Sequence, residues 1–357
     1  MIKTRYLLLV LIAVISMQFF VACGKDSPSF SLLPGGQTFK QNKDAFNNQL
    51  DILWVVDNSG SMGPFQTNLA NNFNSFINDF QKKGYDYRIS VTTSDAYRAA
   101  AGFANNPTIA KFKDGLTTHT GVFVILPTTS DVIGTFVTNA IVGSTGNPDE
   151  RVFSSMRESL NSTLNAGFLR PQSFLAVVIL SDEDDFSGAS RCAGCTPDHS
   201  YTATTLDTVQ SYVTYLDQLT QSTAPSRRYN VSSITVLDDA CRAQHAVQSA
   251  STIIGQRYIQ LSNMTNGVTS SICDASFANS LQSIQARIAE LSTKFFLDRA
   301  PQDGTIVIRV NGIVIPNDSS NGWTYSALDN SITFHGTAVP DQNATIDVSF
   351  VPVTITN

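Results

Sequence analysis

The feature that most constrains this chain is an apolar run, Ile52–Val56, that ends abruptly in Asp-Asn-Ser-Gly-Ser at positions 57–61. Continuous rather than alternating hydrophobicity is typical of a parallel strand that is covered on both faces. The polar residues then follow the carboxyl end of that strand, where open α/β sheets bind their ligands. Asp57, Ser59 and Ser61 offer one carboxylate and two hydroxyls, which are hard oxygen donors suited to Mg²⁺. The alternative is an ordinary Asx turn that closes the strand.

A second apolar strand is followed by a second acidic loop. Phe174–Leu180 is apolar throughout and leads into Ser-Asp-Glu-Asp-Asp at positions 181–185. Four consecutive carboxylates at a strand end repel one another unless a cation offsets their charge. The alternative is a solvated acidic turn, in which screening makes the repulsion tolerable.

These two loops resemble the metal-ion-dependent adhesion site of von Willebrand factor type A domains, and the resemblance covers residues 48–297. In that family the first loop carries Asp-x-Ser-x-Ser, a second loop supplies a Thr and a third loop supplies an Asp. The resemblance implies that Asp182 is the third-loop residue. It also implies a second-loop ligand in the Gly-rich stretch 143–150, where Thr145 is the candidate.

The second loop offers more than one candidate ligand. Thr117, Thr118 and Thr120 are the alternatives to Thr145. A plain loop, with Asp149 or Glu150 capping the helix that follows, also fits the sequence.

The resemblance implies a binding mechanism rather than catalysis. Mg²⁺, or Mn²⁺ or Ca²⁺, would have few anionic ligands and would attract an acidic side chain from a protein partner. The site residues implied are Asp57, Ser59, Ser61, Thr145 and Asp182.

The first residues are typical of a targeting segment. Two basic residues precede an apolar stretch, 6–21, which ends in Ala22-Cys23. This arrangement resembles a bacterial lipoprotein cleavage site, with 1–22 as the signal peptide and Cys23 as the lipid-bearing residue. Gly24 after the Cys resembles the signal for the outer membrane. An uncleaved anchor and ordinary signal-peptide cleavage remain alternatives.

Four further cysteines suggest two disulfides in an exported chain, with three possible connectivities. We favour pairing Cys192 with Cys195 and Cys241 with Cys273. A zinc site formed by Cys192, Cys195 and His199 is the alternative, although a structural zinc site usually needs four ligands.

Strands alternate with helices over residues 48–297, which predicts a doubly wound, mostly parallel α/β sheet. Further strands are expected at 87–93, 122–126, 174–180, 232–237 and 258–261, with Asp131 as a helix cap. One amphipathic helix is expected over 65–80. Residues 298–357 alternate with period two around Asn311-Gly312, which predicts a small β-sandwich-like domain. Residues 23–47 are expected to be a tether.

Charge and motifs limit the function classes. The net charge is −6, and no basic patch is present to neutralise phosphates, so nucleic-acid binding is not expected. The chain lacks Gly-x-Ser-x-Gly, His-Glu-x-x-His, P-loop and dinucleotide motifs, so no enzyme is expected. We expect a membrane-anchored envelope lipoprotein for adhesion or protein–protein interaction. The alternative is a structural or assembly lipoprotein whose metal site is vestigial.

Overall fold

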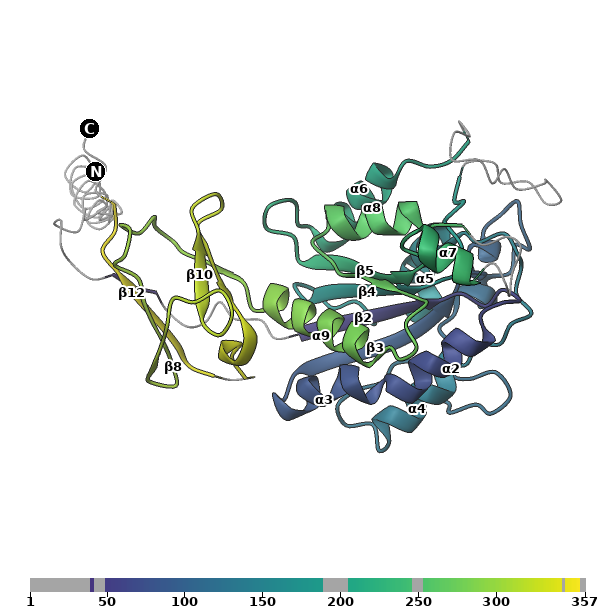
Figure 1. Cartoon of the computed structure of the whole chain (residues 1–357), viewed down its shortest axis with the longest axis horizontal. Helices are drawn as coiled ribbons and strands as arrows, with labels where there is room; N and C mark the ends of the chain where they lie inside the picture. The colour runs from purple at the N-terminus through teal and green to yellow at the C-terminus, as the bar shows by residue number, and fades with distance from the viewer. Residues whose placement is uncertain (1–38, 42–48, 189–204, 246–252, 342–343, 354–357) are drawn as a thin grey trace, which may run out of the picture.

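The computed structural model describes residues 39–41, 49–188, 205–245, 253–341 and 344–353 (Figure 1). The predicted signal peptide, Cys23, Cys192, Cys195 and His199 lie outside these ranges.

A five-stranded sheet, entirely parallel, forms the centre of the larger part of the molecule (Figure 1). The order is β3-β2-β4-β5-β6, so the first long strand, β2, lies between β3 and β4. The predicted parallel α/β sheet is therefore present. Its strands are β2 (Gln49–Val56), β3 (Asp86–Thr93), β4 (Phe174–Leu180), β5 (Tyr229–Thr235) and β6 (Thr269–Ser271).

Helices cover both faces of this sheet, which explains why β2 and β4 are apolar at successive positions. Leu50, Ile52 and Trp54 pack with one group of helices, and Leu53 and Val55 pack with the other. The first group consists of α2 (Gly63–Asn72), α3 (Asn74–Lys82), α4 (Val132–Ala140) and α9 (Ala278–Ser292). The second consists of α5 (Val152–Asn161), α6 (Val209–Thr220) and α8 (Gln256–Met264).

Three predicted elements differ from the structure. Residues 258–261 lie in helix α8, because Tyr258 and Leu261 face the core three residues apart, as on a helix. Residues 122–126 contribute only a single antiparallel bridge, Ile89 to Ile125. The helix expected over 65–80 is divided into α2 and α3 at Phe73, which is itself fully buried.

Two small antiparallel sheets form the C-terminal part. One has the order β1-β12-β8-β9 and the other β10-β11-β7. Asn311 and Gly312 both have positive φ and join β8 to β9, so the predicted two-residue hairpin is confirmed. The bounds are β7 (Phe295–Phe296), β8 (Val307–Val310), β9 (Ile313–Ile315), β10 (Trp323–Ser326), β11 (Ser331–Phe334) and β12 (Ile346–Phe350).

Strand β1 (Phe39–Gln41) lies within the segment expected to be a tether. It pairs antiparallel with β12, with Phe39 opposite Phe350 and Gln41 opposite Val348. The chain therefore contributes a strand to the C-terminal sheet before it enters the α/β sheet. A three-residue strand lacks enough alternation to be recognised in sequence.

The C-terminal sheets share a hydrophobic core with the α/β part. Phe295, Ile332 and Phe334 belong to the same buried cluster as the side chains between β2 and α9. Polar contacts reinforce this junction: Lys294 Nζ lies 2.5 Å from Asp329 Oδ2, and Lys83 Nζ donates to Val339 O at 2.7 Å.

Within the described ranges, none of the helices combines the length and apolar character needed to span a bilayer.

Candidate functional site

The first loop is organised around Asp57, which directly follows β2. The Asp57 N–H donates to Leu180 O at 2.9 Å, so the end of β2 stays beside the end of β4. Asp57 Oδ1 accepts from Ser59 N–H (2.9 Å) and Ser94 Oγ (3.0 Å), and Oδ2 accepts from Ser181 Oγ (2.7 Å). The first and third loops therefore meet at this carboxylate, as expected for adjacent parallel strands.

Burial makes the Asp57 carboxylate electrostatically unfavourable. The side chain is fully buried, and its pKa is raised to about 6 by loss of hydration and then by the charge of Asp182. Hydrogen bonds from Ser59, Ser181 and Ser94 oppose that rise only in part. A positive charge placed here would therefore be favoured.

Several oxygens near this carboxylate are buried and lack a hydrogen-bond partner. They are Ser59 Oγ, Asp182 Oδ1 and both carboxylate oxygens of Glu150. Leaving such groups buried and unpaired costs about 1–3 kcal/mol each, and more when they are charged. Hydroxyl and carboxylate oxygens are the ligands that hard divalent cations take. The residues present therefore fit a cation of this kind.

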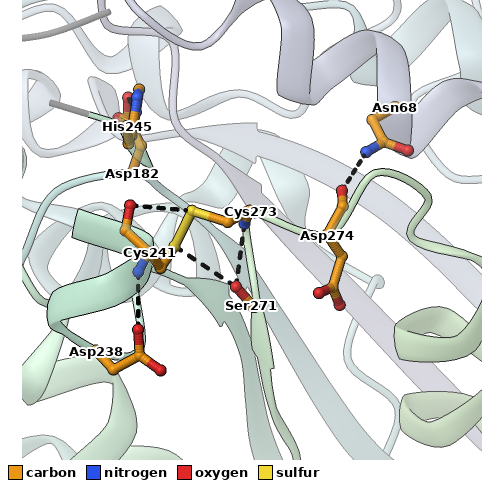
Figure 2. The surroundings of a disulfide bond; sticks show 8 residues. All are labelled: Asn68, Asp182, Asp238, Cys241, His245, Ser271, Cys273 and Asp274. Carbon is orange, nitrogen blue, oxygen red and sulfur yellow. Dashed lines mark hydrogen bonds and ion pairs between the residues drawn. A yellow bond between two sulfur atoms is a disulfide. The ribbon is translucent and has the colours of Figure 1, made fainter. Parts of the chain in front are cut away.

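The carboxylates of the third loop have different hydrogen-bond and ion-pair partners. Asp182 Oδ2 lies 2.6 Å from His245 Nε2, which leaves Oδ1 without a partner (Figure 2). Asp184 accepts from the Arg257 N–H at 3.0 Å, and Asp185 pairs with the Arg257 guanidinium at 3.2 Å. The repulsion expected among four consecutive carboxylates is thus offset in part by arginine and histidine.

Asp185 also explains how helix α5 begins. Its Oδ1 accepts from the Phe153 N–H at 2.9 Å, and Ser187 Oγ accepts from the Ser154 N–H at 2.9 Å. The N-cap position of α5 is Arg151, with no side-chain cap from its own loop. The capping role considered for Asp149 or Glu150 is therefore filled by the third loop.

Glu150 is the residue that sequence analysis did not place in the site. It is completely buried, and its backbone carbonyl accepts from the Phe186 N–H at 2.9 Å. Burial, followed by the charges of Asp57 and Glu183, raises its pKa well above the usual range. The only signal in the sequence was an acidic pair before a helix, which is also typical of an exposed cap.

Thr145 lies on an exposed part of the second loop. The contact with the first loop is made by its neighbour Gly146, whose N–H donates to Asn58 O at 2.7 Å. A side chain at Gly146 would approach Asn58 Cγ to 2.5 Å, so glycine permits this contact.

Among the other candidate residues, Ser61 is half-buried. Of the alternatives, Thr117 and Thr118 are exposed, and Thr120 Oγ1 donates to Asn139 Oδ1.

Within the described ranges, no three His, Cys, Asp or Glu side chains converge into a metal-binding group by themselves. A cation bound here would therefore take hydroxyl ligands as well as carboxylates. The hydroxyls available on the first loop are those of Ser59 and Ser61.

The predicted disulfide between Cys241 and Cys273 is confirmed (Figure 2). Cys241 lies in helix α7 (Asp239–His245), and Cys273 follows β6. Helix α7 also carries His245, the partner of Asp182. The disulfide therefore attaches the helix that holds Asp182 to the edge of the sheet.

Replacing both Cys241 and Cys273 by alanine is expected to lower the free energy of unfolding. The two residues are 32 apart in sequence. Closing a loop of that length is worth about 3.7 kcal/mol through the entropy of the unfolded chain. Urea unfolding of the variant beside the wild type measures the change. An unaltered midpoint would show that the disulfide contributes no net stability.

Comparisons with solved structures give distant likenesses. The pilus adhesin SpaC from Lactobacillus rhamnosus GG, in its open conformation, has a TM-score of 0.41 at 11% identity, covering 88% of this chain and 40% of that chain. A second SpaC structure has a TM-score of 0.38 at 10% identity, with coverages of 88% and 40%. Proximal thread matrix protein 1 from the mussel byssus has a TM-score of 0.37 at 12% identity, with coverages of 70% and 50%.

The chain thus spans half or less of the length of these neighbours. No family model matches the sequence, and no curated protein matches it. The assignment of roles to residues therefore rests on the geometry of the loops after β2 and β4.

Proposed function

We propose that this chain is a von Willebrand factor type A-like binding protein that holds a protein partner through a divalent cation. The observation that carries the proposal is the pair of unpartnered, buried oxygens, Ser59 Oγ and Asp182 Oδ1, beside the buried Asp57 carboxylate. Mg²⁺, Mn²⁺ or Ca²⁺ would satisfy these oxygens and offset the charge. The proposal includes no catalytic step.

The cation would supply a positively charged centre that accepts an oxygen atom from the partner. Asp57 is held by Ser94 and Ser181, and Asp182 is held by His245, so both carboxylates keep fixed positions. Fixed ligands favour recognition, because little freedom is lost when the partner arrives. A protein ligand that presents an acidic side chain fits this chemistry.

The proposed location is the bacterial cell envelope, with a lipid anchor at Cys23 and an outer-membrane destination. The support is the N-terminal sequence, in which a basic start and an apolar segment precede Ala22-Cys23. Two or more acyl chains on one cysteine would hold the protein firmly at a membrane.

Capture of a partner from membrane extracts tests the proposed function. The immobilised wild type should retain a partner in Mg²⁺ or Mn²⁺ and release it in EDTA. Asp57→Ala should retain none, because it removes the carboxylate on which the first and third loops converge. Asp239→Asn is the matched control, because this carboxylate is 79% exposed and lies outside the loop cluster.

If the partner is retained equally well in EDTA, binding of the partner does not depend on a cation. Calorimetry on the wild type tests the alternative function, that of a lipoprotein whose metal site is vestigial. Absence of heat on addition of Mg²⁺, Mn²⁺ and Ca²⁺ would favour a structural or assembly lipoprotein with a vestigial site.

A further inference from the structure

The small sheet β10-β11-β7 ends on one side at β10, and the edge of this strand lies beside a cavity. We propose that this edge is a second binding site, at which an extended peptide with a basic side chain pairs with the main chain of β10. The site lies in the C-terminal part, away from the loops after β2 and β4. The inference therefore does not depend on the proposed function.

The hydrogen-bond pattern shows which main-chain groups of β10 point to its open edge. Along an antiparallel strand, residues that bond to the partner strand alternate with residues whose N–H and C=O point away from it. The Trp323 N–H donates to Pro316 O at 3.0 Å, and Trp323 O accepts from the Asp318 N–H at 3.1 Å. Trp323 therefore directs both groups away from β11. Tyr325 lies two residues further along β10, so its N–H and C=O point the same way.

The third strand of this sheet gives an independent check. Asn330 O, at the start of β11, accepts from the Leu297 N–H beside β7 at 2.8 Å. Ile332 lies two residues after Asn330 and is paired with β7, so its main-chain groups point toward β7. Ile332 is also the residue opposite Tyr325. The two residues are therefore not bonded to each other, and the Tyr325 N–H and C=O remain available at the edge of β10.

A segment of the chain already uses part of this edge. Residues 316–318 run parallel to β10 through the bridge between Asn317 and Trp323. The segment then turns away, because Asp318 Oδ1 accepts from two main-chain N–H groups of the following turn, at 2.6 and 3.0 Å. The edge can thus accept an added strand, and the stretch at Tyr325 lies beyond the point where this strand leaves.

The cavity gives an incoming strand room at that point. Its volume is about 460 Å³, and it is lined by 323–325 of β10 and by residues of the segment 301–306. This volume is within the range found for ligand-binding pockets. Peptides that add to a sheet edge gain affinity from main-chain hydrogen bonds and specificity from pockets for their side chains. The β10 edge and the cavity beside it offer both.

Charge determines which peptide fits. Asp303 is the one charged residue among the described residues that line the cavity, and its side chain is exposed. Burial, followed by the charges of Asp303 and Asp329, raises the pKa of Tyr325. Lys294 pairs with Asp329, whereas no cation pairs with Asp303 in the described part of the chain. A lysine or arginine opposite Tyr325 would offset the charge of Asp303, and its apolar stem would lie against the Tyr325 ring.

An NMR titration of the isotope-labelled full chain in detergent tests this inference. The probe is the peptide acetyl-Thr-Val-Lys-Val-Thr-amide. It should shift the Tyr325 amide signal and slow hydrogen exchange of this amide by about tenfold or more. A peptide with glutamine in place of lysine should bind about fivefold more weakly. A peptide methylated on the lysine main-chain nitrogen should not bind, because it cannot donate to Tyr325 O.

A variant of the protein tests the charge from the other side. Asp303→Asn should weaken binding of the lysine peptide by the same factor of about five, and it should leave binding of the glutamine peptide unchanged. Asp347→Asn is the matched control, because Asp347 is exposed on β12 in the other small sheet. This control should bind all three peptides as the wild type does.

Three results would overturn the inference. If the Tyr325 amide does not respond to the lysine peptide at millimolar concentration, the edge is no binding site. If the lysine and glutamine peptides bind equally well, or if Asp303→Asn changes nothing, the edge does not select a basic peptide. If exchange of the Tyr325 amide slows with protein concentration alone, a second copy of the chain occupies the edge instead.

Discussion

Asp57→Asn is expected to abolish cation binding and, without cation, to raise the stability of the protein at pH 7.5. The side chain is fully buried, and its pKa is raised from 3.8 to about 6, first by burial and then by Asp182. A shift of this size corresponds to a cost of about 3 kcal/mol for holding the charged form in the folded state. Asparagine removes that charge and keeps the shape, and the hydroxyls of Ser94 and Ser181 can rotate to suit the amide.

The sign of the pH dependence follows from the direction of this shift. Because the folded pKa exceeds the unfolded value, the cost is absent below pH 3.8 and complete above about pH 6. Asp184 acts in the same direction, because burial raises its pKa to about 7. The metal-free wild type should therefore melt at a higher temperature at pH 5.5 than at pH 7.5.

Melting curves in EDTA at these two pH values, with and without added cation, measure the effect. Cation should raise the melting temperature of the wild type more at pH 7.5 than at pH 5.5, because protons compete for the same oxygens. Asp57→Asn should show no such response to cation. Asp239→Asn is the control at an exposed carboxylate. If added cation still raises the melting temperature of Asp57→Asn, Asp57 is not a ligand of the cation.

Arg170→Met is expected to destabilise the fold by about 3–5 kcal/mol, because it leaves the buried carboxylate of Asp51 without its guanidinium partner. Arg170 Nη2 lies 2.8 Å from Asp51 Oδ1, and Nη1 lies 2.6 Å from Asp86 Oδ2. The Asp51 side chain, near the start of β2, has no exposed surface. Its remaining partners would be the Arg170 N–H and Ser173 Oγ.

Urea unfolding of Arg170→Met measures this loss. Arg287→Met is a matched control, since Arg287 pairs with Glu290 on helix α9 while 45% exposed. An exposed pair of that kind contributes about 0–1 kcal/mol. Equal losses in the two variants would contradict the role given to burial. The double variant Asp51→Asn with Arg170→Met should recover part of the stability, because the uncompensated charge is gone.

The parts of the fold that sequence analysis predicted correctly are those with a strong local signal. The apolar runs at 52–56 and 174–180 lie in β2 and β4. A strand that is covered on both faces needs apolar side chains at successive positions, so the sequence marks it clearly. Asp131 caps α4 by accepting from the Gly134 N–H at 2.8 Å, as its position suggested. The meeting of the loops after β2 and β4 followed from the parallel order of neighbouring strands.

The missed elements lacked such a signal. Strand β6 consists of Thr269, Ser270 and Ser271, so no apolar run marks it, and only its pairing with β5 makes it a strand. Glu150 was missed for a different reason. The sequence does not distinguish a buried carboxylate from an exposed cap, because the difference arises from Asp185, which reaches α5 from a distant loop.

The pairing of β1 with β12 determines how a mechanical load would travel through the molecule. A force applied before Phe39 acts first on a three-residue antiparallel contact with β12, and only afterwards on β2. The ten residue steps from Phe39 to Gln49 span at most about 3.5 nm when fully extended. Once that short contact is peeled away, the α/β sheet would therefore stay within this distance of the point where the force is applied, and its loops would keep their shape.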